Sequence, residues 1–279
     1  MQGDVPSYEQ CNFQRSLQGM LSCQMIRVPN KRLRLFVEQT AIMQTLHPLV
    51  PVSMVITTLV TLYFLYAAAR SSRAVLVISL GWLILQGAIS ASAFYTVTLG
   101  IPPRFVFLIA PPLLLCITLL VGREGRKLLD KMDTARLTIL HVVRVPVELI
   151  LLSLSLHGSV PELMTFEGRN FDIVSGLSAP LIYYYGYVRK RLNRSILIAW
   201  NITCLLLLIN IVVNAVLAAP FSFQALAFDQ PNIAVLYFPF TWLPGFIVPV
   251  VLLSHLACLR QLIAQTRSGA AKEGKEKLL

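Results

Sequence analysis

Long apolar stretches alternate along this chain with short polar stretches that are mostly basic. Crossing the hydrocarbon core of a bilayer takes about 20 residues of helix. Seven stretches approach or exceed that length, at residues 49–69, 74–99, 104–121, 138–157, 173–188, 195–219 and 234–260. The pattern predicts an all-α integral membrane protein with seven transmembrane helices. The transmembrane domain would cover residues 49–261, between polar tails at 1–48 and 262–279.

The basic residues predict the direction of the spans. If the first span runs from outside to inside, 16 Lys and Arg residues fall on the inner side, against Arg104 and Arg169 in the outer loops. Cytoplasmic loops carry such an excess of Lys and Arg as a general rule. We therefore expect the N-terminus outside and the C-terminus inside. Residues 104–121 contain Pro111-Pro112, but treating them as a re-entrant loop would place the later basic clusters on the wrong side.

The N-terminal tail fits this orientation poorly, because its basic residues would resist translocation across the membrane. One hypothesis is that the biological start lies at Met43, directly before the first span. The alternative is that the tail is an inner or interfacial segment and that the first span runs the other way.

Composition supports a lipid environment and argues against nucleic acid as a partner. The chain is 56% hydrophobic and 13% charged, whereas soluble domains have about 25% charged residues. The net charge of +11 would suit nucleic acid, but the basic residues lie in short clusters between apolar stretches, as in membrane proteins. The predicted partner is the lipid bilayer, and a homo-oligomer stays open.

A weak internal repeat relates the two halves of the chain. "RSSRAVLVISLGW" (70–82) is similar to "RLNRSILIAWN" (191–201), and the spacing from Pro112 to Arg123 equals that from Pro249 to Arg260. Spans one to three and five to seven would then be parallel repeats, with span four as a linker. This 3+1+3 architecture resembles that of SWEET-type sugar transporters. Those proteins have prolines in the first two spans of each half, and spans two and six here have none, so the resemblance concerns architecture alone.

The fourth span, "HVVRVPVELILLSLSLHG", places charge inside the membrane. Glu148 lies near the middle of the span, where a charged group costs about 2.5–3.5 kcal/mol and should face protein or water. His141 and Arg144 share its helix face. Pro146 cannot donate to the Val142 carbonyl, which predicts a kink. Glu148 is either the titrating group of a proton or ion relay with Arg144 as its partner, or half of a buried ion pair with Arg144 that locks span four.

Other polar residues extend the set of candidates. Asn210 and Asn214 of span six could join the relay or hydrogen-bond between helices. The outer loop after span four, "HGSVPELMTFEGRNFDIVSGLSAP", could bind a cation or a polar substrate, or merely cap itself. Its candidate residues are Glu162, Glu167, Arg169 and Asp172.

The four histidines raise the possibility of haem. His141 and His255 fall near the inner side and His47 and His157 near the outer side, as two bis-histidine haems would require. The cysteines lack metal-site spacing, and the chain has no Gly-x-Ser-x-Gly, His-Glu-x-x-His or P-loop motif. We therefore expect no cofactor and no enzymatic activity, with metal binding left open.

Three runs, "HVVRVPVELILL", "PELMTFEGRNFDI" and "INIVVNAVLAAPFSFQALAFDQPNIAVLYFPFTWLPGFIVPVVLLSHL", resemble an uncharacterised group of bacterial multi-pass membrane proteins. The resemblance implies the inner (cytoplasmic) membrane of a bacterium and no particular activity. The sequence favours a carrier for a small solute or ion, coupled to protons through Glu148. The alternatives are a membrane-embedded enzyme or redox protein that uses the outer-loop acids or the histidines, and a structural or sensory subunit.

Overall fold

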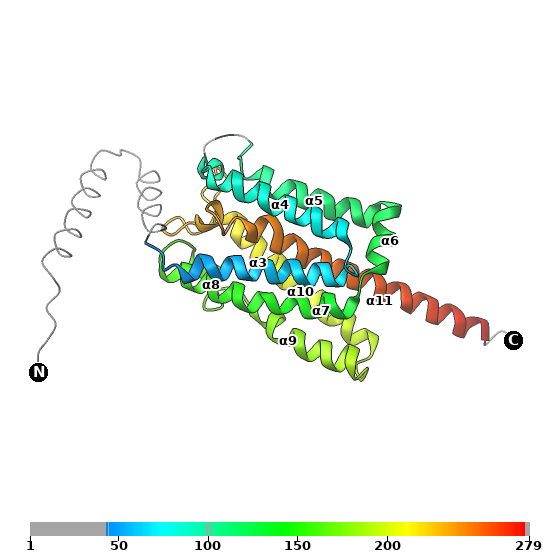
Figure 1. Ribbon diagram of the computed structural model, residues 1–279. Coiled ribbons are helices and arrows are strands. Elements are labelled where there is room, and N and C mark those ends of the chain that lie inside the picture. Colours follow the sequence, from blue (N-terminus) through cyan, green and yellow to red (C-terminus); the bar gives the residue numbers. More distant parts are fainter. Residues whose placement is uncertain (1–42, 44, 99, 101, 277–279) are drawn as a thin grey trace, which may run out of the picture. The chain divides into compact units, whose positions relative to one another are not determined.

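The computed structural model describes residues 43, 45–98, 100 and 102–276, with side chains described through Thr266 of the C-terminal helix. Over these residues the protein is all-α, as the sequence predicts (Figure 1). Almost all of the predicted N-terminal tail lies outside the described residues, and the hypothesis of a start at Met43 stays a prediction.

Five helical segments are long and apolar enough to cross a membrane. They are α3 (Leu49–Ala68), α4 (Arg73–Ala91), the continuous α7–α8 segment (Thr134–Leu156), α10 (Arg194–Leu217) and the segment Leu243–Thr266, which holds most of α11 (Val248–Glu276). Each overlaps one of the seven predicted stretches, so the described part of the chain has the helices of a multi-pass membrane protein.

The other two predicted spans are shorter than expected. α5 (Val106–Val121) meets the length criterion only together with α6 (Arg123–Lys131), which is bent from it by 89°. Six of the nine residues of α6 are charged, so this helix turns away from the apolar direction of α5. α9 (Ile173–Tyr183) has 11 residues and continues as a π turn, Tyr184–Val188. The described residues therefore contain five candidate spans, or six if the bent pair counts as one.

Prolines account for two further differences between the predicted spans and the observed helices, in the fourth and the seventh span. The fourth span divides into α7 (Thr134–Leu140), a 3₁₀ turn (His141–Val143) and α8 (Arg144–Leu156). Pro146 then falls in the first turn of α8, where a missing amide costs no helical hydrogen bond. The seventh span was predicted at 234–260 but begins at Leu243, with a π turn at Leu243–Ile247 that contains Pro244.

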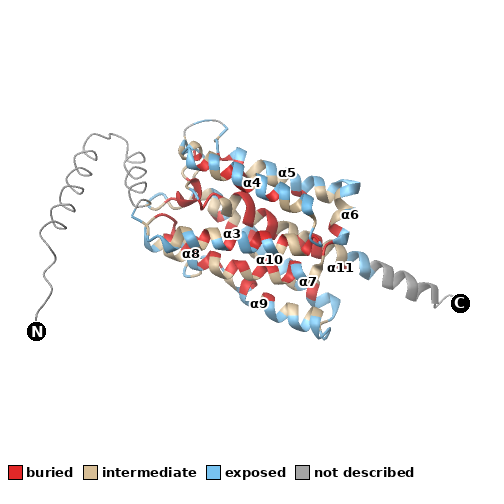
Figure 2. Cartoon of the chain, in the orientation of Figure 1, coloured by how far each residue is buried: buried red, intermediate tan, exposed pale blue. Residues whose placement is uncertain are grey.

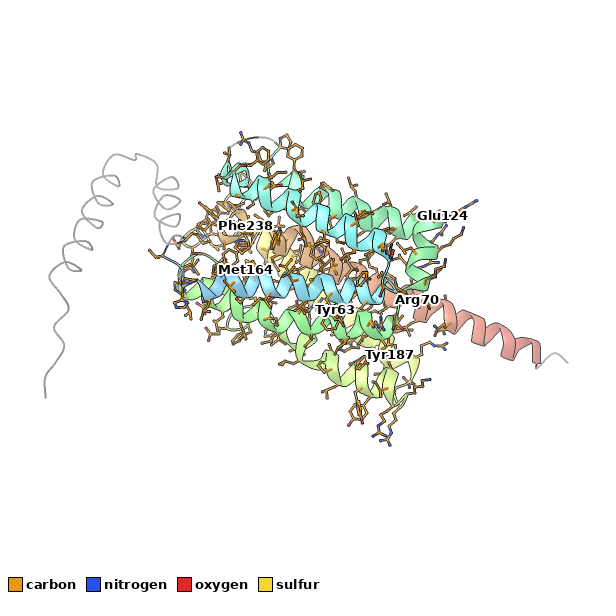
Figure 3. All side chains as sticks on the ribbon, in the orientation of Figure 1. Tyr63, Arg70, Glu124, Met164, Tyr187 and Phe238 are labelled. Carbon is orange, nitrogen blue, oxygen red and sulfur yellow. The ribbon has the colours of Figure 1, made fainter. Side chains whose placement is uncertain are left out.

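Two segments form the centre of the bundle. In the most apolar 18 residues of Thr134–Leu156 and of Leu243–Thr266, 61% and 56% of the residues are buried. The corresponding share is 28% in α4 and in α10. α7 packs against α3, α9 and α11, and α11 also packs against α5 and α10. Figure 2 shows burial concentrated in this centre, while α4 and α5 lie at one edge and α9 at the opposite edge. Met164 and Phe238 lie at one end of the bundle, and Arg70 and Glu124 at the other (Figure 3).

The π turn at the start of the last span attaches α4 to the centre. Trp82 of α4 donates its indole N–H to the Gly245 carbonyl at 2.8 Å, and Trp242 donates to the Leu83 carbonyl at 3.1 Å. A π turn shifts the helical hydrogen-bond pattern by one residue, which makes a carbonyl available to such a donor. A Cβ at Gly245 would lie 2.5 Å from Leu108 Cδ1, so a larger residue here would require the Leu108 side chain of α5 to move.

A second glycine lets α9 approach α8. A Cβ at Gly176 would lie 2.8 Å from Val145 Cγ2, 3.0 Å from the Val145 nitrogen and 3.3 Å from Arg144 Cβ. Small residues at helix interfaces permit such close packing within membranes. This contact places the start of α9 beside Arg144.

We expect Gly176→Leu to destabilise the protein by about 1–3 kcal/mol, because the added side chain has no space between α8 and α9. Gly81→Leu on α4 is the matched control, since a Cβ there meets nothing within 4 Å. Thermal unfolding of the detergent-solubilised variants measures the difference. Equal midpoints for the two variants would contradict the close packing of α9 on α8.

Candidate functional site

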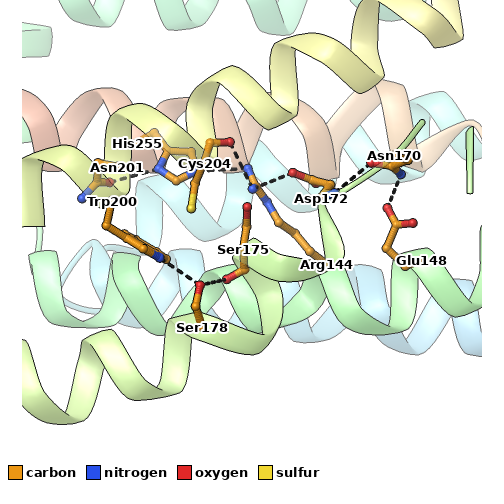
Figure 4. Close-up of polar contacts among 10 residues, drawn as sticks. All are labelled: Arg144, Glu148, Asn170, Asp172, Ser175, Ser178, Trp200, Asn201, Cys204 and His255. Carbon is orange, nitrogen blue, oxygen red and sulfur yellow. Dashed lines mark hydrogen bonds and ion pairs between the residues drawn. The ribbon is translucent and has the colours of Figure 1, made fainter. Parts of the chain in front are cut away.

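A continuous chain of buried polar residues crosses the centre of the bundle (Figure 4). It joins α10, α11 and α8 to the loop that leads into α9. Its members, in spatial order, are Asn201, His255, Arg144, Asp172, Asn170 and Glu148, and each is less than 9% exposed.

Arg144 lies in the middle of this chain and forms an ion pair with Asp172. Its NH1 donates to Asp172 Oδ1 at 2.8 Å and to the Cys204 carbonyl at 3.3 Å. The expected partner, Glu148, is not among the ion pairs of the described residues. Asp172 takes this place because α9 packs closely on α8 and brings its preceding loop to the guanidinium group. Burial raises the pKa of the Asp172 carboxyl, and Arg144 opposes that rise.

His255 continues the chain on the other side of Arg144. Arg144 NH2 lies 3.0 Å from His255 Nε2, and a guanidinium can only donate, so Nε2 accepts. His255 Nδ1 must then carry the proton, which it donates to Asn201 Oδ1 at 3.0 Å. Asn201 in turn donates to the Leu197 carbonyl at 2.9 Å. These contacts assign His255 as a neutral imidazole.

His141 stacks on His255, with ring centroids 3.9 Å apart and an interplanar angle of 13°. Neither ring nitrogen of His141 has a hydrogen-bond partner among the described residues. The stacked rings leave no space between them for a porphyrin. The other two haem candidates, His47 and His157, are exposed, and no cluster of three His, Cys, Asp or Glu residues suited to a metal ion occurs in the described part of the chain.

Glu148 forms the other end of the polar chain. Its Oε1 accepts a hydrogen bond from Asn170 Nδ2, which also donates to the Met164 carbonyl at 3.0 Å. Asn170 Oδ1 accepts from the Asp172 backbone amide at 3.0 Å, which links the two acids through one asparagine. Glu148 Oε2 is buried and has no partner within the described residues.

An apolar cavity of about 370 Å³ lies beside Glu148, between α5, α8, α10 and the π turn of the last span. Of the described residues that line it, Glu148, Asp172 and Asn232 are polar or charged. A second cavity of about 300 Å³ lies between α4, α5 and α11 and includes Trp82 and Gly245 in its wall. The first cavity is within the size range of small-molecule sites, about 300–1,000 Å³.

The remaining candidates do not join the polar chain. Glu162, Glu167 and Arg169 of the outer loop are exposed. Asn210 donates to the Arg169 carbonyl at 2.9 Å, and Asn214 donates to Asn210 at 3.4 Å, so both asparagines tie α10 to this loop.

Sequence reasoning missed Asn170, Asn201 and Asn232 as site residues. An asparagine carries no charge that would mark it as costly in lipid, so its sequence signal is weak. The position of Asn170 between two acidic candidates in the outer loop was the best available clue.

The comparisons with known proteins give a family and no activity. A family model described as a domain of unknown function, DUF8737, matches residues 101–263, which is more than half of the chain. The match contains the whole polar chain and the lining of the 370 Å³ cavity. No curated protein and no solved structure matches the chain.

We expect Arg144→Gln to lower the free energy of unfolding by about 3–5 kcal/mol, because it leaves the Asp172 charge buried without a partner. Arg260→Gln is the control: Arg260 pairs with Asp130 at the surface, where such pairs contribute about 0–1 kcal/mol. Chemical denaturation in detergent measures both. Adding Asp172→Asn to Arg144→Gln should recover part of the loss. Equal losses for Arg144→Gln and Arg260→Gln would contradict a structural role for the buried pair.

Proposed function

We propose that this chain, which belongs to the DUF8737 family, is a membrane carrier for a small solute or ion in which Glu148 holds the exchanged proton. The observation that carries the proposal is the position of Glu148: its side chain lines the cavity, one carboxyl oxygen ends the polar chain, and the other is buried without a partner among the described residues.

The charges of the buried cluster support this role. Arg144 and Asp172 neutralise each other, and the contacts of His255 require a neutral ring. If Glu148 were ionised as well, the cluster would hold one uncompensated negative charge in an apolar interior, which is costly. A proton or a cation at Glu148 removes that cost. The carboxyl group can therefore alternate between the two when a solute enters the cavity.

In this arrangement the Arg144–Asp172 pair has a structural role, and Glu148 is the group that exchanges a proton. The Arg144–Asp172 pair joins α8 to the start of α9 and needs no change of charge during a transport cycle. Glu148 contributes only one oxygen to the polar chain, through Asn170, and its second oxygen has no partner among the described residues, while the residue itself lines the cavity. These contacts favour the relay interpretation of Glu148 over a locking ion pair. If the protein were instead a structural subunit, Glu148 would keep its proton permanently.

We expect proteoliposomes to couple solute entry to proton movement through Glu148. A panel of small organic cations, sugars and inorganic ions is applied against a pH gradient, and a trapped pH-sensitive dye reports protein-dependent proton flux. Glu148→Gln should abolish the coupled flux because an amide cannot exchange a proton. Glu162→Gln, a change of the same chemistry at an exposed outer-loop acid, should retain it. Unchanged coupled flux in Glu148→Gln would remove the relay.

We further propose seven spans in a 3+1+3 arrangement, with the N-terminus outside and the C-terminus inside, in the cytoplasmic membrane of a bacterium. α5 would cross in 16 residues, and so would α9 with its π turn. At about 1.5 Å per residue these segments reach about 24 Å, somewhat less than the core of about 30 Å. Local thinning of the bilayer accommodates such short spans.

Labelling of single cysteines, introduced after the five native cysteines are replaced by serine, tests whether α9 crosses. Glu162→Cys precedes α9 and Arg191→Cys follows its π turn. An impermeant maleimide applied to intact cells should label only the former, and permeabilised cells should label both. Labelling of both sites in intact cells would contradict the crossing of α9 and hence the seven-span arrangement.

A further inference from the structure

We propose that the 370 Å³ cavity binds an organic ammonium ion with an apolar body, and that this cation replaces the proton on Glu148. The exchange of the proton rests on the proposed function, whereas the binding site rests on the cavity itself.

Two residues that line the cavity have a buried hydrogen-bond acceptor without a partner among the described residues. Glu148 Oε2 and Asn232 Oδ1 are both buried, both belong to residues that line the cavity, and neither has a partner among the described residues. The nitrogens of Asn232 already donate within the protein: Nδ2 bonds the Ala215 carbonyl at 3.3 Å, and the backbone N–H bonds the Ala218 carbonyl at 2.9 Å. Buried acceptors without partners are costly, so the fitting ligand supplies N–H or O–H groups.

The charge count narrows the donor to a cation. A neutral alcohol would satisfy the acceptors but could not replace the proton of Glu148, and an anion would be repelled by the carboxylate. A quaternary ammonium ion has the charge but lacks an N–H donor. A primary ammonium group has both, and it forms the stronger, charge-assisted kind of hydrogen bond with a carboxylate.

The rest of the lining suits an apolar body attached to that cation. The rings of Phe105, Phe221 and Phe223 follow one another, with successive centroid distances of 5.4 Å, and all three line the cavity. Phenyl faces attract cations as well as apolar groups. Phe223 and Val106 are also 47% and 43% exposed, so the cavity reaches the surface where α5 begins. An amphipathic amine could enter there from the lipid or from water.

The exchange conserves charge. The ligand enters as R–NH₃⁺, the Glu148 carboxyl group releases its proton to solvent, and the resulting ammonium–carboxylate pair is neutral. Of the other groups that face Glu148 across the cavity, Asp172 is paired with Arg144. The lining from α5 and α10 is apolar, and the π turn contributes Leu243 and Pro244. His255 and His141 lie beyond Arg144, and His255 is fixed by its hydrogen bonds. Binding should therefore weaken as the pH falls, because protons compete for Glu148.

Calorimetry on the full chain in lipid nanodiscs tests the proposal with four matched probes. They are 4-phenylbutylamine, 4-phenyl-1-butanol, 4-phenylbutyrate and N,N,N-trimethyl-4-phenylbutylammonium, and empty nanodiscs correct for partition into lipid. We expect saturable binding of the amine, about tenfold or more tighter than that of the other three. Titrations in buffers of different ionisation enthalpy should show release of about one proton for each bound amine.

Variants assign the binding to this cavity. Glu148→Gln should weaken amine binding by about tenfold or more, and Asn232→Ala by about two- to tenfold, as expected for charged and neutral acceptors. Val212→Phe enlarges an apolar side chain of the cavity lining, leaves Glu148 and Asn232 in place and should abolish binding, so it decides the question if the polar variants fail to fold. Glu162→Gln should bind as the parent does. Thermal unfolding confirms the fold of each variant.

Two results would overturn the proposal: amine binding no tighter than that of the alcohol, or amine binding unchanged in folded Glu148→Gln or Val212→Phe. Amine binding with proton release but without flux in proteoliposomes would support this site and contradict the carrier function. Proton-coupled flux of another solute, with no amine binding, would support the carrier and overturn this site.

Discussion

The buried ion pair between Arg144 and Asp172 is the interaction on which the centre of this protein depends. A charged group inside a membrane protein must meet its counterion and its hydrogen-bond partners within the protein. The two terminal nitrogens of Arg144 do so through contacts with the loop before α9, with a carbonyl of α10 and with His255 of α11. One side chain of α8 thereby fixes three neighbouring segments.

The pair also decides what Glu148 can do. Because the guanidinium group is occupied by Asp172, the second acid of the cluster is left without a counterion of its own. Two acids and one base in an apolar interior create a demand for one positive charge. Because Glu148 lies at the wall of a cavity, the proposed carrier would receive this charge from outside the protein.

The sequence was sufficient to predict an all-α protein in a membrane, because the length of the apolar stretches and the basic clusters between them can be read locally along the chain. It was also sufficient to identify His141, Arg144 and Glu148 as an inward face, and all three are buried. It was not sufficient to pair them. Arg144 and Glu148 are four residues apart and look like partners, whereas Asp172 reaches Arg144 only because Gly176 lets α9 approach α8. The count of seven spans fared less well, since hydropathy does not reveal that α9 is short or that prolines delay the last span to Leu243.

The π turn Leu243–Ile247 forms part of the wall of both cavities. Leu243 and Pro244 face the cavity beside Glu148, while Gly245 and Phe246 face the second cavity next to α4. A π turn contains one residue more than the helix around it, so relaxing it to an α-helix would rotate the residues on one side of it by about 100°. A change in this turn would therefore alter both cavities. Widening one by rewinding this turn would reshape the other and strain the indole hydrogen bond that holds α4.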